Sequence, residues 1–430
     1  MARILITTWH FPNHLNLNVA LAHALAARGH EVAFYTGPSV SELLGGEGFR
    51  NFAFEHVSEA DVEHATEMLR ELRRTPNQLK PYWQKFFVDT IPGQLQDLDR
   101  IWTEWAPDAL VTCLTMWGPI LFTPEMRHVP VIAFSHVANS LLPGPDGAIP
   151  GVAKPRPFRG PRKLVAAILK AVVDRKTEGV RLAASNLRVA RGLPALDAPV
   201  TAYTGRLPLY LMPGTPELDY ERKDLPASVH YIGASLWDKP AAEPAPAWIR
   251  EIRQDKPVVV VDEGALYTLD APMLSLAAQT FVGQPMRVIL LAGQRRKPGS
   301  IPLGNLGTNV SLHYDVALSD VLPYASALVS NGNSDAVIAG LLKGLPLVVL
   351  PAIWDQTELA WAVHQSGAGL RLEPDRTTAD QMRAAVERVL REPSFRQQAQ
   401  RLGEAIAGRG GAPKAAELIE ETLRRREQLV

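Results

Sequence analysis

Short apolar runs alternate along the chain with segments that repeat apolar residues at helical spacing. The first run covers residues 3–8, and residues 18–28 place their apolar side chains largely on one helix face before Gly29 ends the helix. Further apolar runs predict strands at residues 31–35, 109–112 and 129–134. Strands that alternate with helices are typical of a parallel sheet covered by helices. The pattern therefore predicts an α/β protein with one doubly wound Rossmann-like domain over residues 1–225.

The same alternation restarts after a stretch rich in proline, residues 238–247. Strands are predicted there at residues 258–261, 286–291, 310–313, 327–330 and 346–350. We therefore predict a linker at residues 226–250 and a second doubly wound Rossmann-like domain at residues 251–400. The charged residues 401–430 have a helical period, and we expect this segment to pack back on the first domain. Two such domains are expected to face each other across a cleft, with ligands at the carboxyl ends of the strands.

Composition narrows the classes of function. Lys plus Arg and Asp plus Glu each number 45 among 430 residues, so the net charge is zero, and no basic stripe favours nucleic-acid binding. No apolar stretch approaches the roughly 20 residues of a membrane-spanning helix, and the first residues lack the pattern of a secretory leader. A single cysteine, Cys113, excludes an internal disulfide and a cysteine metal cluster. We expect a cytoplasmic protein, monomeric or homodimeric, without a bound metal.

Two histidines follow the first predicted strand, in residues 9–16. This turn has no glycine to wrap a phosphate, but an imidazole there can transfer protons near neutral pH. We predict His14 as the proton-transfer residue; the alternative is that one histidine packs and the other caps the following helix. Residues 142–162 are dense in proline, glycine and arginine. We expect this loop at the entrance for an apolar small molecule, or alternatively as a mobile surface loop.

Three turns follow predicted strands of the second half, at residues 262–265, 292–294 and 330–335. The last of them opens a helix, with Gly332 before it and Ser334 at the expected cap. Its backbone amides suit a diphosphate, although a plain capped helix would have the same pattern. The next strand leads to Asp355 and Gln356, whose side chains together can bind vicinal hydroxyl groups.

An ordered set of motifs extends over essentially the whole chain. It comprises His14 with residues 25–32 (LAARGHEV), residues 231–237 (YIGASLW), the turn Glu263-Gly264, and residues 344–351 (GLPLVVLP), 354–356 (WDQ) and 367–369 (GAG). In this order the motifs resemble the bacterial branch of the family 1, UDP-glycosyltransferase-like, glycosyltransferases. The resemblance implies a GT-B fold, with an acceptor-binding amino-terminal half and a carboxyl-terminal half that binds a nucleotide sugar.

The resemblance also implies residue roles and a reaction. His14 would be the general base for an inverting displacement at the anomeric carbon of a hexose, without a metal. The co-substrate would be a UDP- or dTDP-linked sugar, with no other cofactor, and the acceptor a hydroxyl of an apolar aromatic or polyketide-like small molecule. The donor-binding residues would be Gly264, Gly332, Asn333, Ser334, Trp354, Asp355 and Gln356. The acceptor-binding residues would be Phe11, Trp117, His136 and Leu142.

One departure from the family pattern concerns the base. Members of the family usually place an aspartate beside the histidine, where this chain has Cys113. A neutral thiol stabilises an imidazolium less than a carboxylate does. Either Asp108 or Thr115 substitutes for the usual aspartate, or the base works unassisted.

A second departure concerns the donor turns, which carry the acidic residues Asp262, Glu263 and Asp335. Negative charge is unfavourable close to a diphosphate. The alternative function is therefore a degenerate GT-B protein that binds a small molecule or a partner enzyme without transferring sugar. A GT-B epimerase or phosphorylase is disfavoured, because these turns contain no lysine for a free phosphate or a pyridoxal cofactor.

Overall fold

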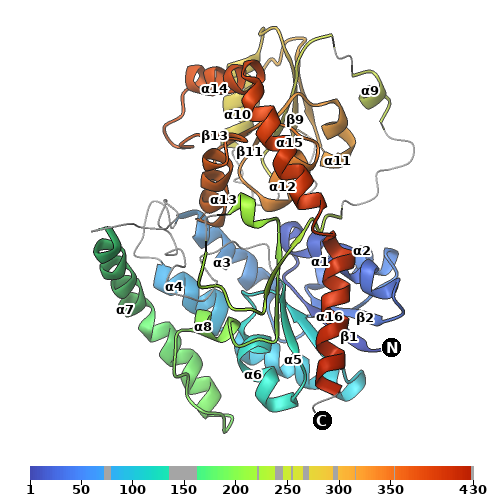
Figure 1. Cartoon of the computed structure of the whole chain (residues 1–430), viewed down its shortest axis with the longest axis vertical. Helices are drawn as coiled ribbons and strands as arrows, with labels where there is room; N and C mark the ends of the chain where they lie inside the picture. The colour runs from blue at the N-terminus through green and yellow to red at the C-terminus, as the bar shows by residue number, and fades with distance from the viewer. Residues whose placement is uncertain are drawn as a thin grey trace. The chain divides into compact units, whose positions relative to one another are not determined.

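The chain folds into two compact units, which Figure 1 shows in the computed structural model. Unit 1 comprises Met1–Pro213, Glu221–Ser235 and Ala412–Val430, and unit 2 comprises Gly214–Tyr220 and Leu236–Gly411. The structure describes residues 1–71, 79–134, 162–219, 222–237, 246–252, 255–264, 271–293, 299–314, 316–352 and 354–427. Each unit is built on one parallel sheet covered by helices, so the predicted class of two doubly wound Rossmann-like domains is confirmed.

Unit 1 contains seven parallel strands in the order β3-β2-β1-β4-β5-β6-β7. They are β1 Arg3–Thr7, β2 Glu31–Thr36, β3 Arg50–Ala53, β4 Ala109–Thr112, β5 Val131–Phe134, β6 Leu209–Pro213 and β7 Val229–Gly233. Strands β4 and β5 are buried at every position. Strands covered on both faces form continuous apolar runs. The sequence pattern therefore predicts them to within two residues.

The sequence pattern misses β3, β6 and β7. Exposed and half-exposed positions interrupt the apolar run in the edge strands β3 and β7. Strand β6 lies between Pro208 and its own last residue Pro213, and prolines at such spacing favour a loop over a strand. The chain enters unit 2 at Gly214–Tyr220, returns to unit 1 for Glu221–Ser235, which includes β7, and passes to unit 2 again at Leu236, so part of the predicted linker 226–250 belongs to unit 1.

Helices cover both faces of this sheet. They are α1 Pro12–Ala26, α2 Ser41–Gly46, α3 Glu59–Glu71, α4 Leu79–Trp83, α5 Ile91–Glu104, α6 Trp117–Arg127, α7 Arg162–Val189 and α8 Val200–Thr204, with short turns of helix at η1 Pro38–Val40 and η3 Gln84–Val88. Helix α1 begins well before the predicted residue 18, because Pro12 favours a helix start and the buried polar residues Asn13 and His14 hide the apolar period.

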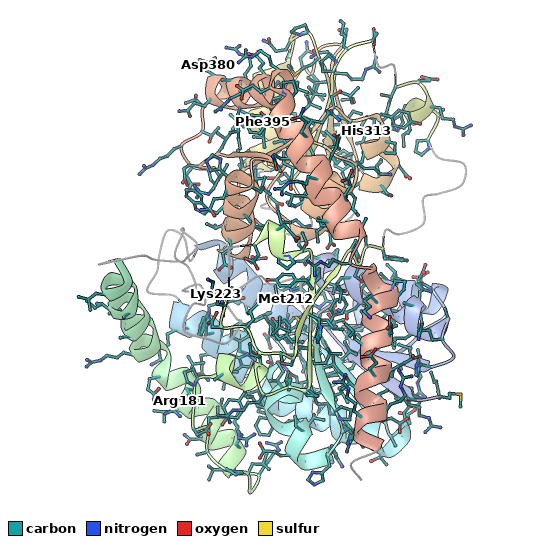
Figure 2. The ribbon with its side chains drawn as sticks, in the orientation of Figure 1. Arg181, Met212, Lys223, His313, Asp380 and Phe395 are labelled. Carbon is teal, nitrogen blue, oxygen red and sulfur yellow. The ribbon has the colours of Figure 1, made fainter. Side chains whose placement is uncertain are left out.

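Unit 2 contains six parallel strands in the order β10-β9-β8-β11-β12-β13. They are β8 Val258–Asp262, β9 Arg287–Leu291, β10 Val310–His313, β11 Ala327–Ser330, β12 Leu347–Val349 and β13 Gly369–Arg371. The helices are α9 Ala247–Arg250, α10 Pro272–Phe281, α11 Leu318–Val321, α12 Ser334–Leu342, α13 Trp354–Gln365, α14 Ala379–Arg391 and α15 Pro393–Ala407, with η5 Pro216–Leu218 and η6 Leu322–Tyr324. Phe281 and Phe395, the latter labelled in Figure 2, complete the core beside β8. No helix in the described parts of the chain is long and apolar enough to cross a membrane.

The last helix, α16 (Gly411–Glu427), belongs to unit 1. Its Glu420 accepts hydrogen bonds from Arg28 Nε at 2.9 Å and Arg28 Nη2 at 2.6 Å, and His30 Nε2 lies 3.0 Å from Glu420 Oε1. The hydrogen bonds from Arg28 lower the pKa of Glu420 to about 2 against the opposing effect of desolvation, and the hydrogen bond from His30 lowers it further. This carboxylate therefore connects the end of the chain to the turn before β2.

Glu420→Gln is expected to lower the midpoint of thermal unfolding at pH 7. The folded-state pKa of Glu420 is below its ordinary value of 4.5, so ionisation stabilises the fold above that value, and the contribution is lost as the pH falls toward 2. The difference between wild type and variant should therefore shrink from about pH 5 downward, as followed by circular dichroism. Glu421→Gln is the control, because Glu421 pairs with Arg425 of the same helix at 3.8 Å. A difference that stays constant with pH would contradict the assignment.

Candidate functional site

His14 lies in the first turn of α1, shortly after the carboxyl end of β1. Phe11 is the residue before this helix and Pro12 begins it. The carbonyl oxygen of His14 accepts hydrogen bonds from Thr8 Oγ1 at 3.3 Å and from Asn18 Nδ2 at 2.8 Å. Only 9% of His14 is exposed. Its backbone and ring are therefore held in one position at the edge of the sheet.

The Nδ1 of His14 lies 3.1 Å from the Sγ of Cys113. Strands β1 and β4 pair in parallel with Thr7 opposite Thr112, so the residues that follow the two strands meet at one edge of the sheet. The same Sγ lies 3.1 Å from the Oγ1 of Thr115, and this oxygen accepts a hydrogen bond from Trp9 Nε1 at 2.9 Å. His14, Cys113, Thr115 and Trp9 form one buried network.

Asp108 is not part of this network. Its Oδ2 accepts a hydrogen bond from the backbone N–H of Arg3 at 2.7 Å, at the amino ends of β1 and β4. That is the opposite edge of the sheet from His14. The hypothesis that Asp108 substitutes for the usual aspartate is therefore wrong, and the group beside the imidazole is Cys113, with Thr115 behind it.

The other histidine of the turn, His10, is fully buried between two carboxylates. Its Nδ1 lies 3.3 Å from Glu59 Oε1 and its Nε2 lies 3.4 Å from Glu63 Oε1, both on α3. Its ring also packs against Phe11, with 4.5 Å between the ring centroids. These contacts connect the turn after β1 to α3, so we interpret His10 as a residue that holds the turn in place.

An aromatic cluster lies beside the His14 network. Trp117, the first residue of α6, stacks on Phe87 with 4.9 Å between centroids, and Phe86 packs on Trp9 at 5.0 Å. Phe86 and Phe87 belong to η3, which is a π-helix. Sequence reasoning did not assign them to the site, although the aromatic run at residues 82–87 is visible, because a π-helix has no apolar period that predicts which side chains point inward.

The four residues expected to bind the acceptor divide into two pairs. Phe11 and Trp117 are buried, and both lie at the edge of the sheet where His14 is found. His136 and Leu142 lie outside the described residues, as does the expected entrance loop as far as residue 161.

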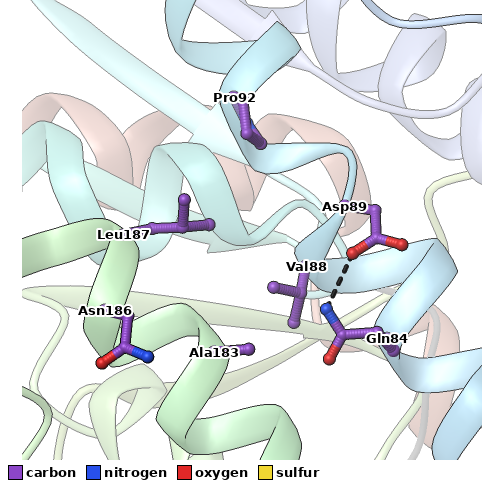
Figure 3. A pocket seen from close by; sticks show the side chains of 7 residues that line it. All are labelled: Gln84, Val88, Asp89, Pro92, Ala183, Asn186 and Leu187. Carbon is purple, nitrogen blue, oxygen red and sulfur yellow. Dashed lines mark hydrogen bonds between the residues drawn. The ribbon is translucent and has the colours of Figure 1, made fainter. Parts of the chain in front are cut away.

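Figure 3 shows a separate pocket of about 490 Å³ in unit 1. Its lining residues come from η3 and the residue that follows it, the start of α5 and the second half of α7: Gln84, Val88, Asp89, Pro92, Ala183, Asn186 and Leu187. Gln84 donates to Asp89 across the pocket wall at 2.7 Å. None of the residues predicted for the site lines it, so we assign this pocket no part in the chemistry of His14.

In unit 2, the turns after β8, β11 and β12 lie against one another. Asn331 donates through Nδ2 to the carbonyl oxygen of Glu263. Gly264 has a φ of +72°, and a Cβ added there would lie 3.0 Å from Asn331 Nδ2 and 3.3 Å from Asn333 Nδ2. Gly332 has a φ of +86°, and a Cβ there would lie 3.0 Å from the carbonyl oxygen of Gln356. Both positions therefore require glycine, for backbone conformation and for space.

Helix α12 begins at the turn after β11. Asn333 caps the helix, since its Oδ1 accepts from the backbone N–H of Asp335 at 3.2 Å, and Ser334 is the first helical residue. The expectation of a serine cap is therefore wrong by one position. The Ser334 Oγ is buried and has no hydrogen-bond partner among the described residues. A hydroxyl at this place can donate to an anion bound at the helix start.

Asp355 and Gln356 lie in the first turn of α13, which Trp354 begins. The Oε1 of Gln356 accepts from the backbone N–H of Ala352 at 2.9 Å, so its amide orientation is fixed. Desolvation raises the pKa of Asp355 to about 6, although hydrogen bonds from the backbone N–H groups of Asp355 and Gln356 oppose the rise. A carboxylate that lacks full solvation gains from polar ligands such as sugar hydroxyls.

Two of the acidic residues at the turns expected to bind the donor have structural roles. Asp262 Oδ1 accepts from the backbone N–H of Gly264 at 3.2 Å, and Glu263 Oε1 accepts from the backbone N–H of Met273 at 3.4 Å. Both carboxylates therefore stabilise the loop after β8. These structural roles account for Asp262 and Glu263, so the two residues do not by themselves favour a degenerate protein that has lost sugar transfer.

An aromatic pair lies at the carboxyl end of β10. The ring of Trp248 on α9 stacks on His313 with 3.6 Å between centroids and 14° between planes, and His313 is labelled in Figure 2. Burial lowers the pKa of His313, which favours the neutral ring. Trp248 directly follows the proline-rich residues 238–247 and is brought to His313 only by the fold.

One group of potential metal ligands occurs among the described residues: Glu55, His56 and Asp97. Asp97 accepts hydrogen bonds from Tyr35 Oη at 2.9 Å and from His56 Nδ1 at 2.7 Å, as well as from the backbone N–H groups of Glu55 and His56. Its carboxylate is therefore already engaged in fixing the loop after β3 to α5, so we assign no metal to this group.

Comparisons with known proteins agree with this architecture. The family of Erythromycin biosynthesis protein CIII-like C-terminal domains matches residues 286–423. The chain is 29% identical to 4'-demethylrebeccamycin synthase of Lentzea aerocolonigenes, over 97% of this chain and 99% of that protein. The structure of the kitacinnamycin glycosyltransferase superposes with a TM-score of 0.76 at 21% identity, covering 98% of this chain and 99% of that chain. The glycosyltransferase VinC in complex with dTDP superposes with a TM-score of 0.69 at 17% identity, covering 98% and 100%. The fold is therefore GT-B.

Asp355→Asn is expected to raise the midpoint of thermal unfolding at pH 8. The folded-state pKa of Asp355, about 6, is above the ordinary value of 3.8, so its ionisation opposes folding, and this cost develops as the pH rises from about 4 to above 6. The amide removes the cost, which is at most about 3 kcal/mol. Below pH 4 the two proteins should unfold alike. A variant less stable than wild type at pH 8 would show that the carboxylate is satisfied by its surroundings.

Proposed function

We propose that the chain, which is similar to the family 1 GT-B glycosyltransferases, is an inverting, metal-independent hexosyltransferase acting on a hydroxyl of an apolar aromatic or polyketide-like small molecule. It is a glycosyltransferase of the type found in natural-product biosynthesis, with a nucleotide diphosphate sugar as donor. In the proposal, unit 1 binds the acceptor and supplies the base, and unit 2 binds the donor.

The single observation that carries the proposal is the His14 network. Since Nδ1 lies against Cys113, Nε2 is the ring nitrogen that takes the acceptor proton. The acceptor oxygen then forms a bond to the anomeric carbon while the bond from that carbon to the diphosphate oxygen breaks. The nucleotide diphosphate leaves with the electron pair. Displacement from the face opposite the leaving group inverts the anomeric centre, and general-base catalysis of this kind contributes about 100-fold or more.

The donor ligands come from the turns that meet in unit 2. The start of α12, with Gly332, Asn333 and the Ser334 hydroxyl, would bind the diphosphate, because it offers backbone amides and the positive end of the helix dipole. Gly264 would let the backbone of the turn after β8 approach the ligand closely. The complex of the related VinC with dTDP supports a dTDP-linked donor.

The sugar would be bound at the start of α13, by Trp354, Asp355 and Gln356. Asp355 accepts from sugar hydroxyls, and Gln356 both donates and accepts. On the acceptor side, Phe11, Trp117, His136 and Leu142 remain the proposed contacts. The aromatic cluster of Trp9, Phe86, Phe87 and Trp117 supports an apolar, flat acceptor beside the base.

His14→Ala is expected to lower kcat by about 100-fold or more while folding and nucleotide binding stay unchanged, because the base acts only as the new bond forms. The measurement is transfer from dTDP-glucose and UDP-glucose to a panel of aromatic and polyketide acceptors. His23→Ala is the control, since His23 lies on the same helix with its side chain paired to Glu47 at 2.8 Å. Unchanged turnover in His14→Ala would remove this residue from the mechanism.

Asp355→Ala is expected to weaken binding of a sugar nucleotide by about tenfold but to spare the free nucleotide, because one charged hydrogen bond to a hydroxyl is lost. Calorimetric titration with UDP, dTDP and GDP, and with the corresponding sugar nucleotides, measures both and identifies the preferred base. Asp380→Ala is the control; Asp380, labelled in Figure 2, is exposed on α14 and pairs with Arg383. Equal losses for the nucleotide and the sugar nucleotide would mean that Asp355 is structural.

A further inference from the structure

We propose that Cys113 is the positioning residue of the base, and that a sulfur in this place restricts transfer to acceptors with acidic hydroxyl groups, phenols and enols, rather than alkyl alcohols. This inference rests on the proposed function. Its starting point is a contact between residues 99 positions apart in the sequence: His14 Nδ1 and Cys113 Sγ, at 3.1 Å.

The hydrogen-bonding groups of Trp9, Thr115 and Cys113 allow an arrangement of protons that leaves Nε2 of His14 basic. The indole N–H of Trp9 can only donate, so Thr115 Oγ1 accepts from it at 2.9 Å. A hydroxyl oxygen has a second lone pair, which can accept the S–H proton of Cys113 across 3.1 Å. The sulfur then offers a lone pair to the Nδ1–H of His14. In this order the neutral ring carries its proton on Nδ1, and Nε2 is the basic nitrogen.

The reverse order would disable the base. If Cys113 donated its proton to Nδ1, the neutral ring would carry its own proton on Nε2 and could not remove one from an acceptor. In the proposed arrangement Thr115 Oγ1, held beside the sulfur by the hydrogen bond from Trp9, accepts the S–H proton and so directs it away from Nδ1. Thr115 and Trp9 therefore act on His14 through Cys113.

The surroundings of Cys113 are closed to solvent. Cys113 is 2% exposed, and Thr115 and Trp9 are also buried. The Tyr210 hydroxyl on β6 is buried as well; burial, and then the charge that the thiol could carry, raise the pKa of Tyr210 well above its ordinary value. Tyr210 therefore remains a neutral phenol. Because bulk solvent does not screen this contact, the interaction of the sulfur with Nδ1 decides how well an imidazolium is stabilised.

The imidazole of His14 is a weaker base with a sulfur beside Nδ1 than it would be with a carboxylate there. A carboxylate beside Nδ1 carries a full negative charge that stabilises the imidazolium formed in transfer, whereas a thiol offers only a weak acceptor. A weaker base suffices only for a proton that leaves easily. Phenols ionise with a pKa of about 10, whereas the O–H of water has a pKa of about 16, and alkyl alcohols resemble water in this respect. The network therefore selects acceptors by acidity of the hydroxyl, independently of their shape.

Two acceptors with the same ring system separate acidity from shape: naphthol, which is a phenol, and naphthylmethanol, which is a primary alcohol. With dTDP-glucose or UDP-glucose as donor, wild type is expected to transfer to naphthol at least about tenfold faster, by kcat/KM. Cys113→Asp is expected to raise transfer to naphthylmethanol by about tenfold and transfer to naphthol by much less, and to move the acidic limb of the pH profile to higher pH. Equal rates in wild type, or an equal change for both acceptors in a folded Cys113→Asp protein, would overturn the proposal that the acidity of the hydroxyl selects the acceptor.

A readout that needs no turnover tests the positioning itself. In protein labelled with ¹⁵N-histidine, the two ring nitrogens of His14 report which of them carries the proton, and His14→Ala assigns their signals. We expect the proton on Nδ1 in wild type and a mixture of tautomers in Cys113→Ala, with kcat lower by about 10- to 100-fold and KM little changed. A proton on Nε2 in wild type, or identical spectra in Cys113→Ala, would overturn the proposal.

Thr115 supplies a matched pair of variants. Thr115→Val removes the oxygen with little change in shape, and Thr115→Ser keeps it. The valine variant is expected to shift the His14 signals in the same direction as Cys113→Ala, and the serine variant to match wild type. Valine and serine variants that behave alike would show that Thr115 only fills space. Because the spectra are read without an acceptor, failure of transfer in every protein would count against the proposed function and leave the result on positioning intact.

Discussion

The parallel pairing of β1 with β4 is the constraint on which the candidate base depends. Thr7 lies opposite Thr112, their hydroxyls are hydrogen-bonded at 2.7 Å, and the backbone N–H of Cys113 donates to the carbonyl oxygen of Thr7 at 3.1 Å. These bonds fix the point at which both strands end. The turn that carries His14 and the turn that carries Cys113 then have no freedom to separate. A shift of register by one residue would move every following side chain to the other face of the sheet. The contact between His14 and Cys113 would then be lost.

The turns proposed to bind the donor depend on the same principle in unit 2. Strand β8 pairs with β11, and β11 with β12, so the three strands end at one edge of the sheet and the turns that follow them lie together there. There the side chain of Asn331 holds the carbonyl of Glu263, and the close approach of Gly332 to Gln356 leaves no room for a side chain. Close packing of the backbone fixes the positions of these turns in unit 2, whereas a network of polar side chains fixes the position of His14 in unit 1.

The sequence predicts what depends on burial and order, and misses what depends on packing in three dimensions. Inner strands such as β4 and β8 are buried throughout and largely apolar, and they are predicted closely, as is the position of His14 after β1. The edge strands β3 and β13, with the sequences RNFA and GLR, lack an alternating apolar pattern and are missed, whereas the edge strand β10, with VSLH, has one and is predicted. The predicted cap of α12 lies one residue late, because asparagine and serine both cap helices and only the backbone conformation distinguishes them. The contact of Trp248 with His313, and the contact of Cys113 with His14, join distant residues that no local period relates.

The return of the last helix to unit 1 has a consequence for how the protein is made. Unit 1 is assembled from three separate stretches of chain, and the last of these, Ala412–Val430, is synthesised after the whole of unit 2. Domains that are continuous in sequence can fold in turn as they leave the ribosome, the amino-terminal one first. In this protein the order differs. Unit 1 is complete only when Glu420 has been translated and can contact Arg28 and His30, by which time all residues of unit 2 have been translated. During synthesis the unit that carries His14, although it is translated first, is therefore the last to be completed.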